Sequence, residues 1–120
     1  MIKSLKFAGI AVRDQAKAVA FWTEKVGFRV MTDQPLGNQR WIELGIGKSE
    51  TRIVLFTPDG HQDRVGSFFN GSFACDDVEA TYRQMSAKGV EFSKPPKKEP
   101  WGTSAVFKDA DGNSFVLSSS

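Results

Sequence analysis

The chain has 120 residues, a size typical of one compact domain, with 40% hydrophobic and 25% charged residues and a formal net charge of only +2. Its only basic block is the pair Lys97 and Lys98, which argues against nucleic-acid binding, because phosphate recognition needs a concentrated basic face. No apolar stretch is long enough for a signal peptide or a membrane span, and a single cysteine excludes an internal disulfide. We therefore expect a soluble, cytoplasmic protein that binds neither nucleic acid nor membranes.

The first elements are predicted to be a strand and a helix. Apolar and small residues alternate along Leu5–Val12, as in a half-buried strand. Asp14 can then cap a helix, in which apolar residues recur at helical spacing until Gly27. Three further strands are predicted, over Phe28–Thr32, Trp41–Ile46 and Thr51–Phe56, with connecting segments at Asp33–Gln39 and Gly47–Glu50. The first half therefore has the order β-α-β-β-β.

The second half repeats this order. Its predicted elements are a strand over Ser67–Cys75, a helix capped by Asp77 and ending at Gly89, and strands over Val90–Ser93, Thr103–Lys108 and Ser114–Ser118. A loop with three prolines, Lys94–Gly102, and a turn at Asp109–Asn113 connect the last three strands. The loop Lys94–Gly102 is interpreted either as a lid or as a long hairpin connection.

The two halves are related by an internal repeat. Laying Phe7 on Asn70, an offset of 70 − 7 = 63, also aligns Asp14 with Asp77 without a gap. The chain is therefore predicted to be one α+β domain built from two tandem βαβββ modules, about 1–58 and 67–120, with a linker at 59–66. Curved mixed sheets from the two modules can enclose a cleft.

Strand alternation then predicts which residues face the helices and which face the cleft. The predicted helix-facing residues are Ile10, Val12, Val54, Phe56, Phe73, Cys75, Phe115 and Leu117. The predicted cleft residues are Phe7, Gly9, Ala11, Trp41, Glu43, Ile53, Leu55, Asn70, Ser72, Ala74, Trp101, Thr103, Ala105, Phe107, Ser114 and Val116. A partly apolar concave surface of this kind is the usual place for a ligand.

Two such modules, each opening with a strand, an aspartate and a helix, and with the turn Asp109-Ala110-Asp111-Gly112-Asn113 before the last strand, resemble the vicinal oxygen chelate superfamily. That superfamily includes glyoxalase I, extradiol dioxygenases, fosfomycin resistance enzymes and bleomycin resistance proteins. The resemblance implies the glyoxalase/bleomycin resistance fold and a homodimer. Whether modules pair within one chain or between two is left open.

Enzymes of that superfamily hold one divalent metal with residues from the first and last strands of each module. Carried over by the resemblance, the corresponding positions here are Phe7, Leu55, Asn70 and Val116. Three of these side chains have no donor atom, and one asparagine cannot hold a metal alone. We therefore expect no metal and no cofactor. The only histidine, His61, is expected on the surface between the halves.

Glu43 is the one weak candidate for a catalytic residue. A carboxylate among apolar cleft residues can have a raised pKa and act as a general base. The alternative is a residue near the sheet rim that reaches water or pairs with Arg40 or Arg52.

The candidate ligand-binding residues combine flat aromatic rings with a few polar groups. Trp41 and Trp101 offer stacking surfaces, although either could instead close the core or a dimer contact. Asn70 and Ser72 can hydrogen-bond a polar group of a ligand. The full set is Phe7, Trp41, Glu43, Leu55, Asn70, Ser72, Trp101, Phe107 and Val116.

These features favour a metal-independent protein that binds a small aromatic or amphipathic molecule, as the drug-sequestering members of the superfamily do. One alternative is a glyoxalase-like lyase or isomerase with a non-standard site. The other is a structural or regulatory partner with a filled cleft. The sequence does not name the ligand or decide whether any catalysis occurs.

Overall fold

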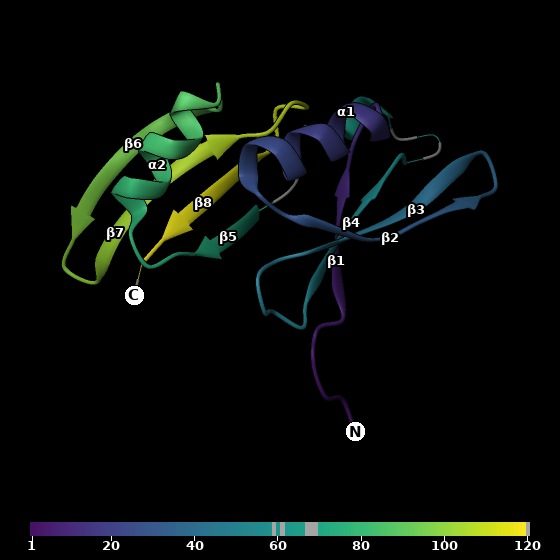
Figure 1. Ribbon diagram of the computed structural model, residues 1–120, viewed down its shortest axis with the longest axis horizontal. Coiled ribbons are helices and arrows are strands. Elements are labelled where there is room, and N and C mark those ends of the chain that lie inside the picture. Colours follow the sequence, from purple (N-terminus) through teal and green to yellow (C-terminus); the bar gives the residue numbers. More distant parts are fainter. Residues whose placement is uncertain (59, 61, 67–69, 120) are drawn as a thin grey trace. The chain divides into compact units, whose positions relative to one another are not determined.

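The computed structural model describes residues 1–58, 60, 62–66 and 70–119. The chain divides into two compact units, Met1–Val65 and Gly66–Ser120, each with one four-stranded mixed sheet and its own helix (Figure 1). The predicted order β-α-β-β-β is present in both units.

Unit 1 contains β1 (Phe7–Ala11), α1 (Gln15–Ala20), a π-helical continuation η1 (Phe21–Val26), β2 (Arg29–Leu36), β3 (Gln39–Gly45), β4 (Arg52–Phe56) and a short 3₁₀ turn η2 (Gln62–Arg64). Its sheet, sheet 1, has the strand order β1-β4-β3-β2, in which β1 and β4 are parallel and the other neighbours antiparallel. As predicted, Asp14 caps α1 by accepting a hydrogen bond of 3.0 Å from the Lys17 backbone N–H. The helical segment ends at Gly27, whose φ of 97° is left-handed.

Unit 2 contains β5 (Asn70–Ala74), α2 (Val78–Ala87), β6 (Glu91–Glu99), β7 (Gly102–Lys108) and β8 (Ser114–Ser118). Its sheet, sheet 2, has the equivalent order β5-β8-β7-β6, with β5 and β8 parallel. Asp77 caps α2 through a hydrogen bond from the Ala80 backbone N–H, which matches the role of Asp14 in unit 1. The predicted strand start at Ser67 lies outside the described residues.

Two segments predicted as connections are strands in the structure. β2 runs through Pro35 to Leu36, and β6 runs through Pro95 and Pro96 to Glu99. Both β2 and β6 are edge strands, where a proline without an N–H costs no ladder hydrogen bond on its free side. The β6–β7 register shifts between Lys94 and Lys97, which absorbs the two prolines. The prediction of a loop over Lys94–Gly102 is therefore wrong, because this segment is mostly the edge strand of a hairpin.

Each unit buries one face of its sheet beneath its helix. In unit 1 the core residues are Ile10, Val12, Ala18, Phe21, Trp22, Ile42, Leu44, Ile53 and Leu55, all at most 7% exposed. In unit 2 an aromatic cluster joins the helix to the sheet, because Tyr82 of α2 contacts Phe92, and Phe92 contacts Phe107. The opposite face of each sheet carries no helix of its own unit.

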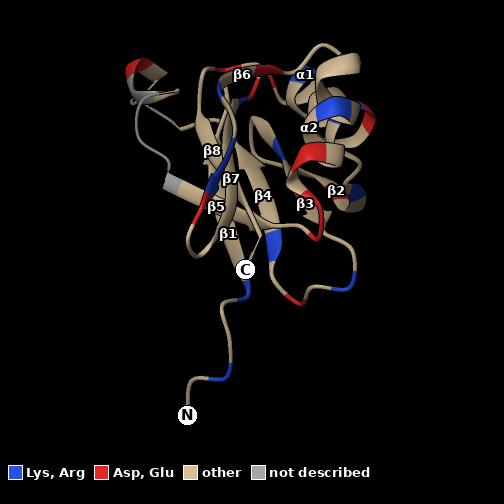
Figure 2. Ribbon diagram, turned by 90° about the vertical axis from the view of Figure 1, so that its left-hand side faces the viewer, with Lys and Arg blue, Asp and Glu red and all other residues tan. Residues whose placement is uncertain are grey.

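Charged side chains do not gather on one element. Figure 2 shows Lys and Arg positions scattered among Asp and Glu positions along the ribbon. This distribution along the chain agrees with its small net charge.

Candidate ligand-binding site

The register of β4 assigns other β4 residues to the helix-free face of sheet 1 than the sequence predicted. Ile10 pairs with Leu55, and Gly9 pairs with Val54. Side chains of directly opposite residues lie on the same face, so Leu55 shares the buried face of Ile10 and Val54 shares the face of Gly9. Leu55 is fully buried, and its predicted place in the cleft is wrong. The same shift moves Ile53 to the helix side.

We define the helix-free face of sheet 1 by residues whose register agrees across all four strands, together with Met31, which lies at a bulge of β2 and whose side chain lies over Gly45. They are Phe7, Gly9 and Ala11 of β1, Arg29, Met31, Thr32 and Gln34 of β2, Trp41, Glu43 and Gly45 of β3, and Arg52, Val54 and Phe56 of β4. A Cβ on Gly9 would come within 2.9 Å of the Phe56 ring, so the ring lies across this glycine. Phe56, predicted to face the helix, is therefore on the opposite side.

In sheet 2 the predicted face of β7 is also reversed. Phe107 pairs with Phe115, and the centroids of their rings are 5.4 Å apart. Phe107 is only 1% exposed and belongs to the aromatic cluster under α2. Phe107 is therefore a core residue and does not line a cleft. Thr103 and Ala105, four and two residues before it in β7, share its helix-facing side.

The corrected registers change one of the four positions at which metal ligands are expected in the superfamily. Gly9 pairs with Val54, and its repeat equivalent Ser72 pairs with Val116. Val54 therefore corresponds to Val116, at an offset of 116 − 54 = 62, and takes the place given to Leu55.

The donor chemistry of these positions does not fit a metal. Phe7, Val54 and Val116 carry only hydrocarbon, and the amide of Asn70 is a poor ligand by itself. Among the residues that the structure describes, no three His, Cys, Asp or Glu side chains gather closely enough to hold an ion. The chemistry of this face must come from its aromatic and ion-paired side chains.

Four side chains from three strands form a connected group on the helix-free face of sheet 1. The ring of Phe7 meets Trp41 edge to face, with centroids 5.4 Å apart and planes at 81°. The Trp41 indole Nε1–H donates to Glu43 Oε2 at 2.7 Å, and Arg52 Nη1 donates to Glu43 Oε1 at 2.8 Å. Phe7 is 38% exposed and Trp41 is half-buried, so the indole is held in one orientation while part of it stays accessible.

The environment of Glu43 gives its carboxyl the opposite pKa shift from the one that a general base needs. Hydrogen bonds from Trp41 and then Arg52 lower the pKa of Glu43 from its ordinary 4.5, and these outweigh its desolvation. Glu43 is therefore an ionised acceptor that orients Trp41 and Arg52. The hypothesis that it is a base with a raised pKa is wrong, and its alternative, a pair with Arg52, is what the structure contains.

We expect Glu43 to titrate in acid with an effect on Trp41. The folded pKa is depressed, so the stabilisation from this group is present above its unfolded pKa and is lost as the pH falls through the lower folded value. Tryptophan fluorescence should change in a step below pH 4.5, and Glu43→Gln should lack this step. A step near neutral pH that Glu43→Gln abolishes would contradict this assignment.

The helix-free face of sheet 2 has a different character. Ser72 and Val116 pair across β5 and β8, and together with Val106 and Ser114 they line a depression of about 480 Å³. The hydroxyl oxygens of Ser72 and Ser118 lie 3.2 Å apart. Asn70 begins β5, opposite Ser114 in the register, and its side chain lies outside the described part. This face carries small hydroxyl and aliphatic side chains, whereas that of sheet 1 is aromatic and charged.

The remaining predicted contacts lie elsewhere. Trp101 is 58% exposed at the β6–β7 turn and does not belong to the face of a strand. His61 lies outside the described residues.

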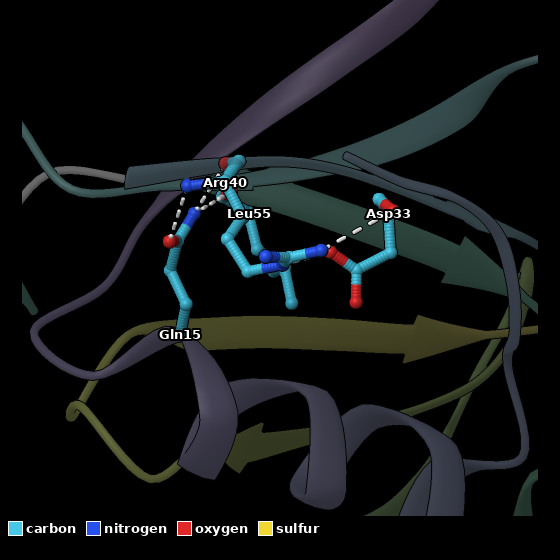
Figure 3. Close-up of polar contacts among 4 residues, drawn as sticks. All are labelled: Gln15, Asp33, Arg40 and Leu55. Carbon is cyan, nitrogen blue, oxygen red and sulfur yellow. Dashed lines mark hydrogen bonds and ion pairs between the residues drawn. The ribbon is translucent and has the colours of Figure 1, made fainter. Parts of the chain in front are cut away.

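Gln15, at the start of α1, holds the two central strands of sheet 1, β3 and β4 (Figure 3). The Gln15 side-chain amide donates to the backbone oxygens of Arg40, at 2.7 Å, and Leu55, at 3.0 Å, and accepts from the Arg40 N–H. The Arg40 guanidinium is paired with Asp33, so this arginine is engaged on the helix side of the sheet. These contacts fix β3 and β4 relative to α1.

Sequence reasoning missed Val54 and Phe56 as residues of the candidate face and mentioned Arg52 only as a partner of Glu43. β4 reads Arg-Ile-Val-Leu-Phe, so four consecutive apolar residues hide the alternation. The repeat contains the missing signal. An offset of 62 places Val54 on Val116, and Ile53 and Leu55 on the helix-facing Phe115 and Leu117.

The chain belongs to the glyoxalase/bleomycin resistance protein/dioxygenase superfamily, whose family model matches residues 4–117. It is 40% identical over 121 residues to the uncharacterized protein YetH of Bacillus subtilis, covering 98% of each chain. Its fold is similar to the crystal structure of UcmS2, with a TM-score of 0.89, 34% identity and 98% of each chain covered.

A second solved structure has a described activity. TnmS3, an antibiotic binding protein from Streptomyces sp. CB03234, is similar with a TM-score of 0.87 and 34% identity, over 98% of this chain and 96% of that one. The predicted fold of two tandem βαβββ modules is thus confirmed. None of the described helices has the length and apolar character that crossing a membrane requires.

Proposed function

We propose that this protein binds a small planar aromatic or amphipathic molecule without a metal, and that it sequesters rather than transforms the molecule. The observation that carries the proposal is the orientation of Trp41. Its indole is fixed by Phe7 on one side and by the Glu43 carboxylate at its N–H, yet the residue is only partly buried. A flat surface that is already ordered loses little conformational entropy when a ring stacks on it.

Two further observations support this function over catalysis. The carboxylate at the centre of the group already accepts two strong hydrogen bonds and has a lowered pKa, so it is a weak proton acceptor. The positions at which enzymes of the superfamily bind a metal carry no suitable donor set. The similarity to TnmS3, described as an antibiotic binding protein, provides a relative of this fold with the proposed type of activity.

A fluorescence titration tests the proposal. Trp101→Phe removes the exposed indole and leaves Trp22, which is fully buried, and Trp41 as emitters. Chelator-treated Trp101→Phe protein is titrated with bleomycin and with a panel of planar polycyclic compounds. We expect saturable quenching by at least one of them, and a loss of about tenfold in affinity, about 1.4 kcal/mol, in Trp41→Ala. Failure of every compound to change the emission would contradict the proposed function.

A further inference from the structure

On the helix-free face of sheet 1, the Arg52 guanidinium still has N–H donors available, whereas the Glu43 carboxylate is already ion-paired. Both Glu43 oxygens accept bonds, and the Trp41 N–H is used by one of them. Arg52 uses Nη1 for Glu43, while its Nε and Nη2 have no hydrogen bond to any described residue. Its side chain is 38% exposed. A guanidinium has five N–H donors in a planar fork, so Arg52 can bind an additional acceptor beside the indole.

The charges on this face have an excess of positive sign. Arg52 lies next to Glu43, and Arg29 lies farther along the face, where its Nη2 donates to the Gly47 carbonyl. Lys6 precedes β1 and is close enough to contribute to the lowered pKa of Glu43. Glu43 is the single carboxylate that the described strands of unit 1 place on this face, because Asp33 pairs with Ile42 and lies on the other side. One carboxylate therefore faces more than one cation.

From this arrangement we infer that the ligand is a planar aromatic anion, with its ring against Phe7 and Trp41 and its anionic oxygen accepting from the free N–H groups of Arg52. A carboxylate, sulfonate or ionised phenol attached to the ring supplies such an oxygen, and the guanidinium can bind it through two parallel hydrogen bonds. A cationic ligand would meet Arg52 and Arg29 as like charges, and the charge of Glu43 is already paired with Arg52. This inference rests on the proposed function and adds the charge of the ligand.

Three compounds with the same ring system separate charge from stacking. 9-Anthracenecarboxylate, 9-anthracenemethanol and 9-anthracenylmethylammonium are titrated into the full chain by calorimetry at low salt. We expect the anion to bind at least about tenfold more tightly than the cation, with the neutral alcohol between them. Added salt should reduce the preference, because an exposed guanidinium is screened.

Arg40 provides a matched control for Arg52. Both are partly exposed arginines of sheet 1 that form one ion pair, but Arg40 lies on the helix side with Asp33. Arg52→Gln should reduce the affinity for the anion about tenfold and leave that for the alcohol nearly unchanged, whereas Arg40→Gln should change neither. Circular dichroism of both variants checks that the fold is intact.

The outcomes distinguish the proposed binding of an aromatic molecule from the proposed preference for an anion. If all three anthracenes bind with similar affinity and Trp41→Ala weakens them all, the charge preference is wrong while the proposed binding at this face stands. If none binds, the aromatic binding function and the inference built on it both fail. If the anion binds most tightly but Arg52→Gln has no effect, the assignment to Arg52 is overturned.

Discussion

Replacing Trp22 by alanine is expected to lower the free energy of unfolding by about 4 kcal/mol, in the range measured for buried large aromatics. Trp22 is fully buried in η1, with its ring stacked on Phe28 at 5.3 Å between centroids and against the edge of Phe21 at 5.2 Å. Its removal leaves a cavity between helix and sheet. Because domains of this size are stable by only about 5–15 kcal/mol, the effect is a large part of the total.

The other two tryptophans provide the comparison. Trp101→Ala should change the stability by less than about 0.5 kcal/mol, because this side chain is exposed at a turn. Trp41→Ala should cost about 1 kcal/mol, from its contact with Phe7 and its partial burial. Urea unfolding followed by far-UV circular dichroism measures all three, and Trp22→Phe serves if Trp22→Ala does not fold. Equal losses for Trp22 and Trp41 would show that Trp41 is a core residue and would remove the basis of the proposed site.

Asp109→Ala is the second substitution with a large expected effect, about 3 kcal/mol. Asp109 is 8% exposed in the turn between β7 and β8, and its carboxylate is the acceptor there. It accepts hydrogen bonds of 2.9 Å from the backbone N–H groups of Asp111 and Asn113 and from the Asn113 side-chain amide. Alanine leaves these buried donors without their acceptor. The turn also lies against Gly66, whose φ is 86° and where a Cβ would come within 2.2 Å of the Asp111 oxygen.

The contribution of Asp109 to the free energy of unfolding depends on pH with the opposite sign from the contribution of Glu43. Burial raises the pKa of Asp109 above 3.8 and outweighs the hydrogen bonds that lower it. The folded state therefore binds this proton more tightly than the unfolded state, so the difference between wild type and Asp109→Ala should widen as the pH falls through the folded pKa. Urea unfolding at neutral and acidic pH measures it. Asp76→Ala, at an exposed aspartate of the same unit, is the control and should have little effect. A loss below about 0.5 kcal/mol for Asp109→Ala would contradict the role of the turn.

The reliable part of the sequence prediction came from strands and caps with an unambiguous pattern. In β8 the sequence Ser-Phe-Val-Leu-Ser places Phe115 and Leu117 on the buried face, as predicted. The aspartates before both helices cap them because a side-chain oxygen at that position can accept a hydrogen bond from the backbone N–H three residues further on. The repeat made both modules predictable from either one.

The errors have specific physical causes. β4 is apolar on both faces, so periodicity could not decide between Val54 and Leu55. The three prolines of Lys94–Gly102 and the polar, glycine-bearing segment Asp33–Gln39 suggested connections. The structure has the edge strands β6 and β2 there, and an edge strand tolerates proline. The shared face of Trp41 and Glu43 follows from their spacing along one strand, whereas the direction of the Glu43 pKa shift depends on Arg52 of another strand. That long-range contact could be found only once the register was known.

The central claim is that Trp41 and its neighbours bind a planar molecule without a metal, and the fluorescence titration with a metal arm tests it most directly. The protein is treated with a chelator, titrated with the tightest compound of the panel, and titrated again after addition of Zn²⁺ or Ni²⁺. Our account predicts the same affinity in both titrations and its loss in Trp41→Ala. Binding that appears only after the metal is added, or that is unchanged in Trp41→Ala, would contradict it.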